Sequence, residues 1–373
     1  MTAMTRYTFG TTIPQSIEAV RPRVEAALRA EGFGVLTEID VAATAAHAAN
    51  LVDRGVRVSS AFAYLDPARA TGRLRIVDEA LCDRLAIVNG GVEVVARRRG
   101  AEIRVRATTA VLSAGAYGSP ALLLRSGIGD PLELERVGIA VTHALPGVGC
   151  NLHDHPIVEL EFTGSRELAS ALEAARRQRF TPEEQTIGKL RSSRAVGPYD
   201  LHLIPVAAHP HSLLGGRTLL AVGALEVHSR GRLRLRAPDP EAAPLLDHGY
   251  LGDAEKHDLA VLAEGVERAR ELAGASPLRA LLGREVLPGP GGDLGAAIRR
   301  LHGHYFHPAG TCAMGPASDS LAVCDGEGRV HGLPQVVVAD CSLMPVLPRA
   351  NTNAPAVVVG ERIADVLLEA RRE

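Results

Sequence analysis

Apolar and polar positions alternate along much of the chain in short runs that are typical of β-strands. From about Arg57 five such runs follow one another, with Pro67, Gly72 and the Gly90-Gly91 pair in the turns between them. The runs are RVSSAFAYL, GRLRIVDEA, DRLAIVN, GVEVVARRR and AEIRVRATTAVLSAG. Between about residues 157 and 300, further alternating runs accompany a long helical pattern, DAEKHDLAVLAEGVERARELAGA. This pattern of apolar and polar positions predicts sheets with one buried face and helices packed on them.

Two apolar segments have a different pattern: TTAVLSAGA reads as a hydrophobic strand, and VVVAD as the kind of strand that is buried in a parallel sheet. The first, TTAVLSAGA, leads into a short predicted helix with Ser119 as N-cap, Pro120 at its first position and Gly127 after its end. The second, VVVAD, is followed by the loop PRANTNAP and a terminal helix, VVVGERIADVLLEARRE. A strand that enters a helix through a glycine turn lets the backbone approach a ligand, although a plain α/β connection has the same pattern.

Composition narrows the class of protein. Lys and Arg number 41 against 43 Asp and Glu, so the net charge of -2 argues against nucleic-acid and membrane-surface binding. No stretch has the length and apolar content of a membrane span, and the first residues do not resemble a signal peptide. Five scattered cysteines without a C-x-x-C pair indicate reduced thiols. We expect a cytoplasmic protein.

The densest polar cluster is LHGHYFHPAGTCAMG, which contains His302, His304 and His307. Three histidines permit a zinc site, but no H-E-x-x-H and no carboxylate ligand at helical spacing accompany them, so we expect no metal. A single neutral histidine held by the turn at Pro308 can instead accept a proton near neutral pH. A hydrogen-bonded structural histidine would have the same sequence.

Two further clusters contain asparagine and histidine. Asn353, in NTNAP before the terminal helix, can cap that helix or hydrogen-bond a substrate oxygen. His153, Asp154 and His155 alternate, so their side chains would face opposite ways in an extended segment, and we interpret them as a structural loop. No G-x-S-x-G supports a serine hydrolase, and no G-x-G-x-x-G follows a strand.

Together these strings resemble the glucose–methanol–choline (GMC) family of flavin-dependent oxidoreductases, in particular its choline dehydrogenase-like members. The resemblance covers about residues 53–373 and rests on strings in the family's order. They are RVSSAFAYLDPA, GAYGSPALLLRSGIG, LPGVGCNLHDHP, HYFHPAGTCAMG, VVVADCSLMP and NTNAP followed by GERIADVL.

The resemblance implies an FAD-dependent oxidation of a small-molecule alcohol, a CH–OH donor. His307 matches the family's active-site histidine, the proposed base for the alcohol proton, and Asn353 matches the second active-site position, which hydrogen-bonds the substrate oxygen. Hydride would pass to the flavin. The residues that the resemblance associates with FAD binding are Cys82, Ala114, Gly115, Ser119, Ala339 and Asp340.

The predicted fold is α/β: a partial Rossmann-like FAD-binding domain of the GMC type with an inserted α+β substrate domain. Residues 53–156 and 308–373 form the FAD-binding part, and residues 157–307 form the insert. Residues 1–52 read as strand, helix and strand and resemble the start of a DUF302 domain.

Complete family members open with the G-x-G-x-x-G unit that this sequence lacks, so about half of the FAD domain is missing. We therefore expect weak FAD binding and exposed apolar surface that a partner chain or oligomer would cover. The alternative function is an inactive truncated or chimeric remnant, or one half of a split enzyme.

Overall fold

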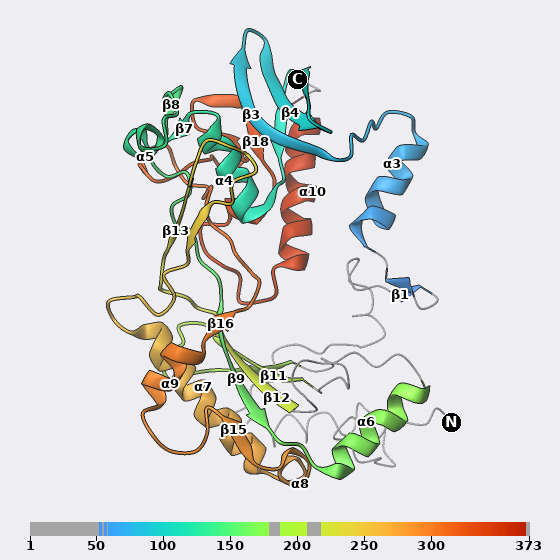
Figure 1. Ribbon diagram of the computed structural model, residues 1–373, viewed down its shortest axis with the longest axis vertical. Helices are drawn as coiled ribbons and strands as arrows, with labels where there is room; N and C mark the ends of the chain where they lie inside the picture. The colour runs from blue at the N-terminus through green and yellow to red at the C-terminus, as the bar shows by residue number, and fades with distance from the viewer. Residues whose placement is uncertain (1–51, 54–55, 58, 179–186, 207–217, 371–373) are drawn as a thin grey trace. The chain divides into compact units, whose positions relative to one another are not determined.

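A computed structural model of the protein describes residues 52–53, 56–57, 59–178, 187–206 and 218–370 (Figure 1). These residues form two compact units. Unit 1 consists of the described residues of 155–228 and 251–306, and unit 2 of the described residues before 155, of 229–250 and from 307 on. The segment interpreted as DUF302-like lies, apart from its last residue, outside the described residues. Residues 229–250 belong to unit 2, whereas the sequence placed them in the inserted domain.

Unit 1 is built on an antiparallel sheet in the order β10-β11-β12-β9-β15, with β16 paired to β9. The strands are β9 (Pro156–Phe162), β10 (Gly188–Leu190), β11 (Leu201–Val206), β12 (Thr218–Ala224), β15 (Glu285–Leu287) and β16 (Gly303–His304). Every residue of β12, an inner strand of the sheet, is buried, and α7 (His257–Gly274) packs against β9, β11 and β12. The other helices of this unit are α6 (Arg166–Gln178), α8 (Leu278–Leu282) and α9 (Leu294–Leu301). The sheet and the long helix that the sequence predicted are confirmed.

Unit 2 contains two three-stranded sheets (Figure 1). One is the antiparallel meander β3-β4-β5 (Ala80–Val88, Gly91–Arg98, Ala101–Ala107). The other is ordered β17-β18-β6 (Arg329–Val330, Leu333–Val338, Ala110–Leu112). Shorter pairs are β1 with β2 (Val52–Asp53, Val56–Arg57), β7 with β8 (Ile128–Gly129, His143–Ala144), and β13 with β14 (Arg232–Arg234, Leu245–Asp247).

Strands β6 and β18 run parallel, with Val336 opposite Ala110 and Val338 opposite Leu112. Besides α4 (Gly115–Arg125), the described residues of unit 2 form five helical segments: η1 (Ala61–Leu65), α3 (Asp66–Ala70), α5 (Pro131–Arg136), η2 (Cys341–Leu343) and α10 (Asn353–Glu369). Leu123 of α4 and Ile363 of α10 belong to the same apolar cluster as β18. The α/β class and the buried parallel strand predicted at VVVAD are therefore confirmed.

Three local predictions were wrong. Residues 61–70 are helical, not a strand, because the segment is rich in good helix formers and Pro67 suits a first helical turn. Most of GRLRIVDEA precedes β3, which begins at Ala80. Helix α4 begins at Gly115, so Pro120 lies inside it and Ser119 is not its N-cap. Among the described residues, no helix has the length and apolar character needed to cross a membrane.

Candidate active site

Asp340 joins the end of β18 to the start of α4. Its Oδ2 accepts hydrogen bonds from the Gly115 N–H at 2.9 Å and the Ser119 hydroxyl at 2.5 Å, while Oδ1 accepts from the Ser342 N–H at 2.8 Å. The Ser119 Oγ also accepts the Ala114 N–H at 3.0 Å. Four residues that the resemblance associated with the cofactor, Ala114, Gly115, Ser119 and Asp340, therefore meet in one hydrogen-bonded junction.

Ala339 lies beside this junction, since its N–H donates to Leu112 O at 2.8 Å and thereby continues the pairing of β18 with β6. Gly115 has a left-handed φ of 76°, and a Cβ built on it would meet open space. The parallel strand pair thus ends in a turn whose backbone a bound group can approach closely.

A proline inside α4 connects this helix to the turn that contains His307. Pro120 has no N–H, so the carbonyl of Ala116, four residues earlier, lacks its helical donor. The Thr311 hydroxyl donates to that carbonyl at 2.6 Å instead. The motifs GSP and HPAGT are therefore complementary, because Pro120 leaves the Ala116 carbonyl without a helical donor and Thr311 donates to that carbonyl.

The HPAGT turn is also bound to the segment 149–154. His153 and Ala309 exchange two backbone hydrogen bonds, at 3.2 and 2.9 Å, and Gly149 N–H donates to Thr311 O at 2.8 Å. Gly310 has φ 88°, and a Cβ placed on it would lie 2.4 Å from His153 Cε1 and 2.5 Å from Asn151 O. This position therefore requires glycine both for its backbone conformation and for the close approach.

His307 itself is buried, with 7% of its surface exposed. Its backbone N–H donates to Asp154 Oδ1 at 2.9 Å. Burial lowers the pKa of the His307 imidazole from about 6.5 to about 4. The side chain is consequently neutral at neutral pH, which is the state in which it can accept a proton.

A second buried histidine, His153, stands against the same turn. Its Nδ1 lies 2.5 Å from Asn151 O and therefore carries the proton of that hydrogen bond. Burial, with a smaller contribution from the positive charge of Arg230, lowers the pKa of His153 to about 4, although its bond to Asn151 opposes the shift.

The lowered pKa values of His153 and His307 make the stability of the fold depend on pH. Each pKa is about 4 in the folded chain and about 6.5 in the unfolded chain, so between these values the unfolded state binds more protons. The free energy of unfolding should therefore fall as the pH drops from 6.5 to 4, by up to about 3 kcal/mol per histidine, and should not change through this effect above pH 6.5.

Urea unfolding at pH 4.5 and pH 7.5 measures the effect. His307→Gln removes one of the two titrating groups, so this variant should lose about half as much stability on acidification through these groups as the unsubstituted chain. Equal losses in the two proteins would show that protonation of His307 does not contribute.

Asn353 is the first residue of α10, and its side chain is exposed. The preceding Thr352 occupies the N-cap without a side-chain capping bond, so the structure does not use Asn353 as the cap that its position suggested. Asn353 and His307 belong to the same unit.

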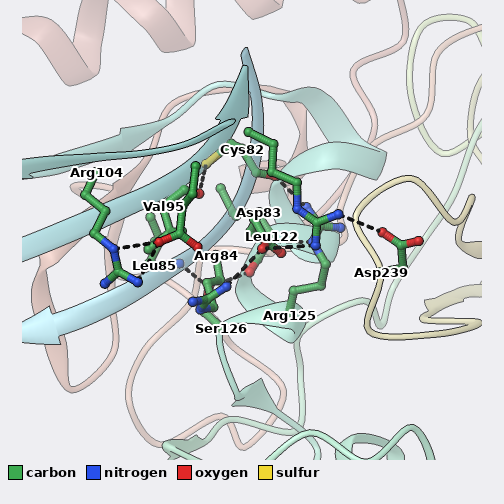
Figure 2. A network of polar contacts seen from close by, with 12 residues as sticks. Cys82, Asp83, Arg84, Leu85, Val95, Arg104, Leu122, Arg125, Ser126 and Asp239 are labelled. Carbon is green, nitrogen blue, oxygen red and sulfur yellow. Dashed lines mark hydrogen bonds and ion pairs between the residues drawn. The ribbon is translucent and has the colours of Figure 1, made fainter. Parts of the chain in front are cut away.

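Cys82 lies on β3, where Arg125 at the end of α4 contacts its carbonyl (Figure 2). Arg125 donates to the carbonyls of Asp83 at 2.7 Å and Cys82 at 3.1 Å. The Asp83 carboxylate contacts Arg84 at 2.9 Å and Arg97 at 3.6 Å. Burial raises the pKa of the Cys82 thiol, so it stays protonated at neutral pH. The Cys82 carbonyl is thus already occupied by a guanidinium within the chain.

The other two histidines of the cluster, His302 and His304, belong to unit 1, whereas His307 belongs to unit 2. His302 caps the end of α9 and its Nδ1 lies 3.0 Å from Arg299 O, while His304 is exposed on β16. Within the described parts of the chain, no three metal-ligating side chains gather in one place.

Sequence reasoning missed Asp154, which it assigned to a structural loop. The residue is 1% exposed, and besides the His307 N–H it accepts the Tyr250 hydroxyl at 2.9 Å. The local sequence could not show this role, because the two donors lie far along the chain from Asp154.

Comparison with known proteins decides the family. Two GMC oxidoreductase domain models match the chain, one over residues 31–157 and the other over residues 227–360. The chain belongs to the GMC oxidoreductase family. The matches include the α4 segment, the segment 149–154, His307 and Asp340, so the junction described above lies within the family's own domains.

Curated relatives of this GMC protein include an oxygen-dependent choline dehydrogenase of Chromohalobacter salexigens, 33% identical over 96% of this chain and 66% of the relative. An uncharacterized GMC-type oxidoreductase of Mycobacterium tuberculosis is 34% identical over 84% of this chain and 63% of the relative. The chain thus spans slightly less than two thirds of the relatives it matches.

Solved structures agree with the fold. Pyridoxine 4-oxidase from Mesorbium loti has a TM-score of 0.74 at 26% identity, covering 84% of this chain and 62% of that one. The formate oxidase of Aspergillus oryzae has a TM-score of 0.73 at 22% identity, covering 86% of this chain and 64% of that one, and supports the fold alone.

Proposed function

We propose that this protein oxidises a CH–OH group of a small-molecule alcohol, with FAD as electron acceptor and with His307 and Asn353 as the working pair. The observation that carries the proposal is the buried, neutral imidazole of His307, whose pKa burial lowers to about 4. A neutral imidazole accepts the hydroxyl proton, and the Asn353 amide hydrogen-bonds the oxygen as charge develops on it. Bound FAD supplies the acceptor for the hydride.

The described residues fit one part of FAD. The turn at Ala114 and Gly115 closes the parallel pair β6/β18 and leaves open space at the Gly115 Cα. A planar ring can approach such a backbone, and Ala339 and Asp340 end the neighbouring strand. These residues would hold the flavin end of the cofactor.

The same residues do not fit the diphosphate. The Gly115 N–H at the start of α4 already donates to the Asp340 carboxylate, and a phosphate placed beside that carboxylate would be repelled. No G-x-G-x-x-G in this sequence offers another cradle. We therefore expect FAD to bind weakly and to leave the protein on gel filtration. A stoichiometric yellow protein after that step would contradict this expectation.

The experiment for the proposed function supplies FAD in excess and follows aldehyde formation from a panel of alcohols with an artificial electron acceptor. Choline and pyridoxine head the panel, because similar proteins are a choline dehydrogenase and a pyridoxine 4-oxidase. We expect FAD-dependent aldehyde from at least one alcohol. A chain that binds added FAD but oxidises none of the panel would argue against the proposal.

A second candidate is a half-enzyme that needs a partner chain to complete the FAD site. Among the described residues, β6 is an edge strand of its sheet, and Val111 on it is 45% exposed; a partner chain would cover this edge. Failure to take up FAD even at saturating concentration would favour this candidate.

A cytoplasmic location remains a prediction, supported by Cys312 and Cys324, which are buried free thiols.

A further inference from the structure

Asp154 is a buried carboxylate held between two donors within unit 2. Its Oδ1 accepts the His307 backbone N–H and its Oδ2 accepts the Tyr250 hydroxyl, both at 2.9 Å. Only 1% of its surface is exposed. Because a buried carboxylate strongly favours charge-assisted hydrogen bonds, both donors are drawn to fixed positions.

The Tyr250 side of this arrangement continues to α4. The Tyr250 ring stacks on His248 with centroids 5.0 Å apart and planes 3° apart. His248 Nε2 lies 2.8 Å from the Tyr117 hydroxyl, and Tyr117 is the third residue of α4. Burial and the charge of Asp154 raise the pKa of both tyrosines, so their hydroxyls stay protonated. The contacts connect Asp154 with the helix that starts at the Gly115 turn.

On the other side of Asp154, His307 follows a residue with an unusual backbone conformation. Phe306, directly before it, has φ 59°. A bulky residue in the left-handed region persists only where its surroundings hold it there. The next amide, that of His307, is the one that Asp154 binds.

We propose that Asp154 is the positioning residue of His307. Asp154 fixes the His307 backbone and, through Tyr250, His248 and Tyr117, holds that backbone in a constant position relative to the start of α4. The inference rests on the proposed function, since it gives His307 a reacting position. Asp154 acts through the main chain of His307 and takes no proton in the reaction.

Two substitutions separate this role from a requirement for charge. Asp154→Ala removes the acceptor that both donors share, whereas in Asp154→Asn the amide oxygen can still accept the His307 N–H while its NH₂ donates to the Tyr250 oxygen. With FAD supplied, we expect Asp154→Ala to lower kcat about 100-fold with little change in KM. Asp154→Asn should stay within about a factor of five of the unsubstituted protein.

Asp130→Ala is the matched control. Asp130 is also a carboxylate of unit 2 that accepts two backbone amides, those of Leu132 and Glu133, at the start of α5. It lies outside the contacts that reach His307, so its loss should lower stability without changing kcat.

Hydrogen exchange gives a readout that does not need flavin. The His307 amide should exchange at least about tenfold faster in Asp154→Ala, because its acceptor is gone, and should keep its protection in Asp154→Asn. The Leu145 amide, bonded to Gly129 O at 2.9 Å, should be unchanged in both variants and reports on global unfolding.

The proposal is overturned if the His307 amide keeps its protection in Asp154→Ala, or if Asp154→Asn loses as much kcat as Asp154→Ala. Failure of the proposed function has a different signature: His307→Gln would then leave alcohol oxidation intact, whatever the exchange data show.

Discussion

Replacing His307 by glutamine is expected to lower kcat for alcohol oxidation by a factor of about 10² to 10⁴, the usual contribution of a general base. Glutamine has a similar size and keeps hydrogen-bonding atoms, but it cannot accept the hydroxyl proton. The buried imidazole, neutral because its pKa is lowered to about 4, is the group that the substitution removes. Steady-state kinetics with FAD in excess measures the effect.

His304→Gln serves as the control, because His304 lies three residues earlier, is exposed and belongs to unit 1. We expect this variant to retain its kcat. If the two variants lose activity equally, the effect of His307→Gln cannot be assigned to proton transfer. A fully active His307→Gln protein would remove His307 from the mechanism.

Gly310→Ala is expected to destabilise the fold by about 2–5 kcal/mol, the sum of an unfavourable backbone conformation and of overpacking. Gly310 has φ 88°, and the new Cβ would lie 2.4 Å from His153 Cε1 and 2.5 Å from the backbone oxygen of Asn151. Neither neighbour can move away freely, since His153 is buried and its backbone is bonded to Ala309. Urea unfolding followed by circular dichroism measures the change.

Gly326→Ala is the matched substitution for this test. Gly326 is exposed in the same unit, no atom lies within 4 Å of the Cβ that alanine would add, and its φ lies outside the left-handed region. Its stability should change by less than about 1 kcal/mol. Similar unfolding curves for Gly310→Ala and Gly326→Ala would contradict the described packing of the HPAGT turn.

Some elements could be predicted from sequence because one pattern decided them. The continuous apolar run of VVVAD has few alternatives to a buried parallel strand, and the structure shows β18 paired in parallel with β6. The Gly90-Gly91 pair likewise predicted a hairpin turn, and the structure shows β3 and β4 joined by a turn at Asn89 and Gly90.

Other features depend on partners far apart in the chain. Pro120 and Ser119 predicted a helix start, because their local preference favours it. In the structure, Thr311 donates to the Ala116 carbonyl that Pro120 leaves unpaired, and Ser119 donates to Asp340. These bonds allow α4 to begin at Gly115, and no local pattern contains them.

Asp154 shows the same limit at the candidate site. Alternation in an extended segment predicted that His153, Asp154 and His155 face opposite ways, and the segment was interpreted as a loop. Its importance comes from Tyr250 and the His307 amide, which lie about 100 and 150 residues further along the chain. Such a contact becomes visible only when the fold is known.

We propose that His307 removes the alcohol proton while hydride passes to FAD. The most direct measurement is the visible absorbance of flavin in the chain with FAD in excess, without oxygen, before and after an alcohol is added. We predict that the flavin absorbance is lost with the unsubstituted protein and persists with His307→Gln at equal flavin occupancy. Flavin absorbance that no alcohol removes, or that is lost equally fast in the variant, would contradict the account.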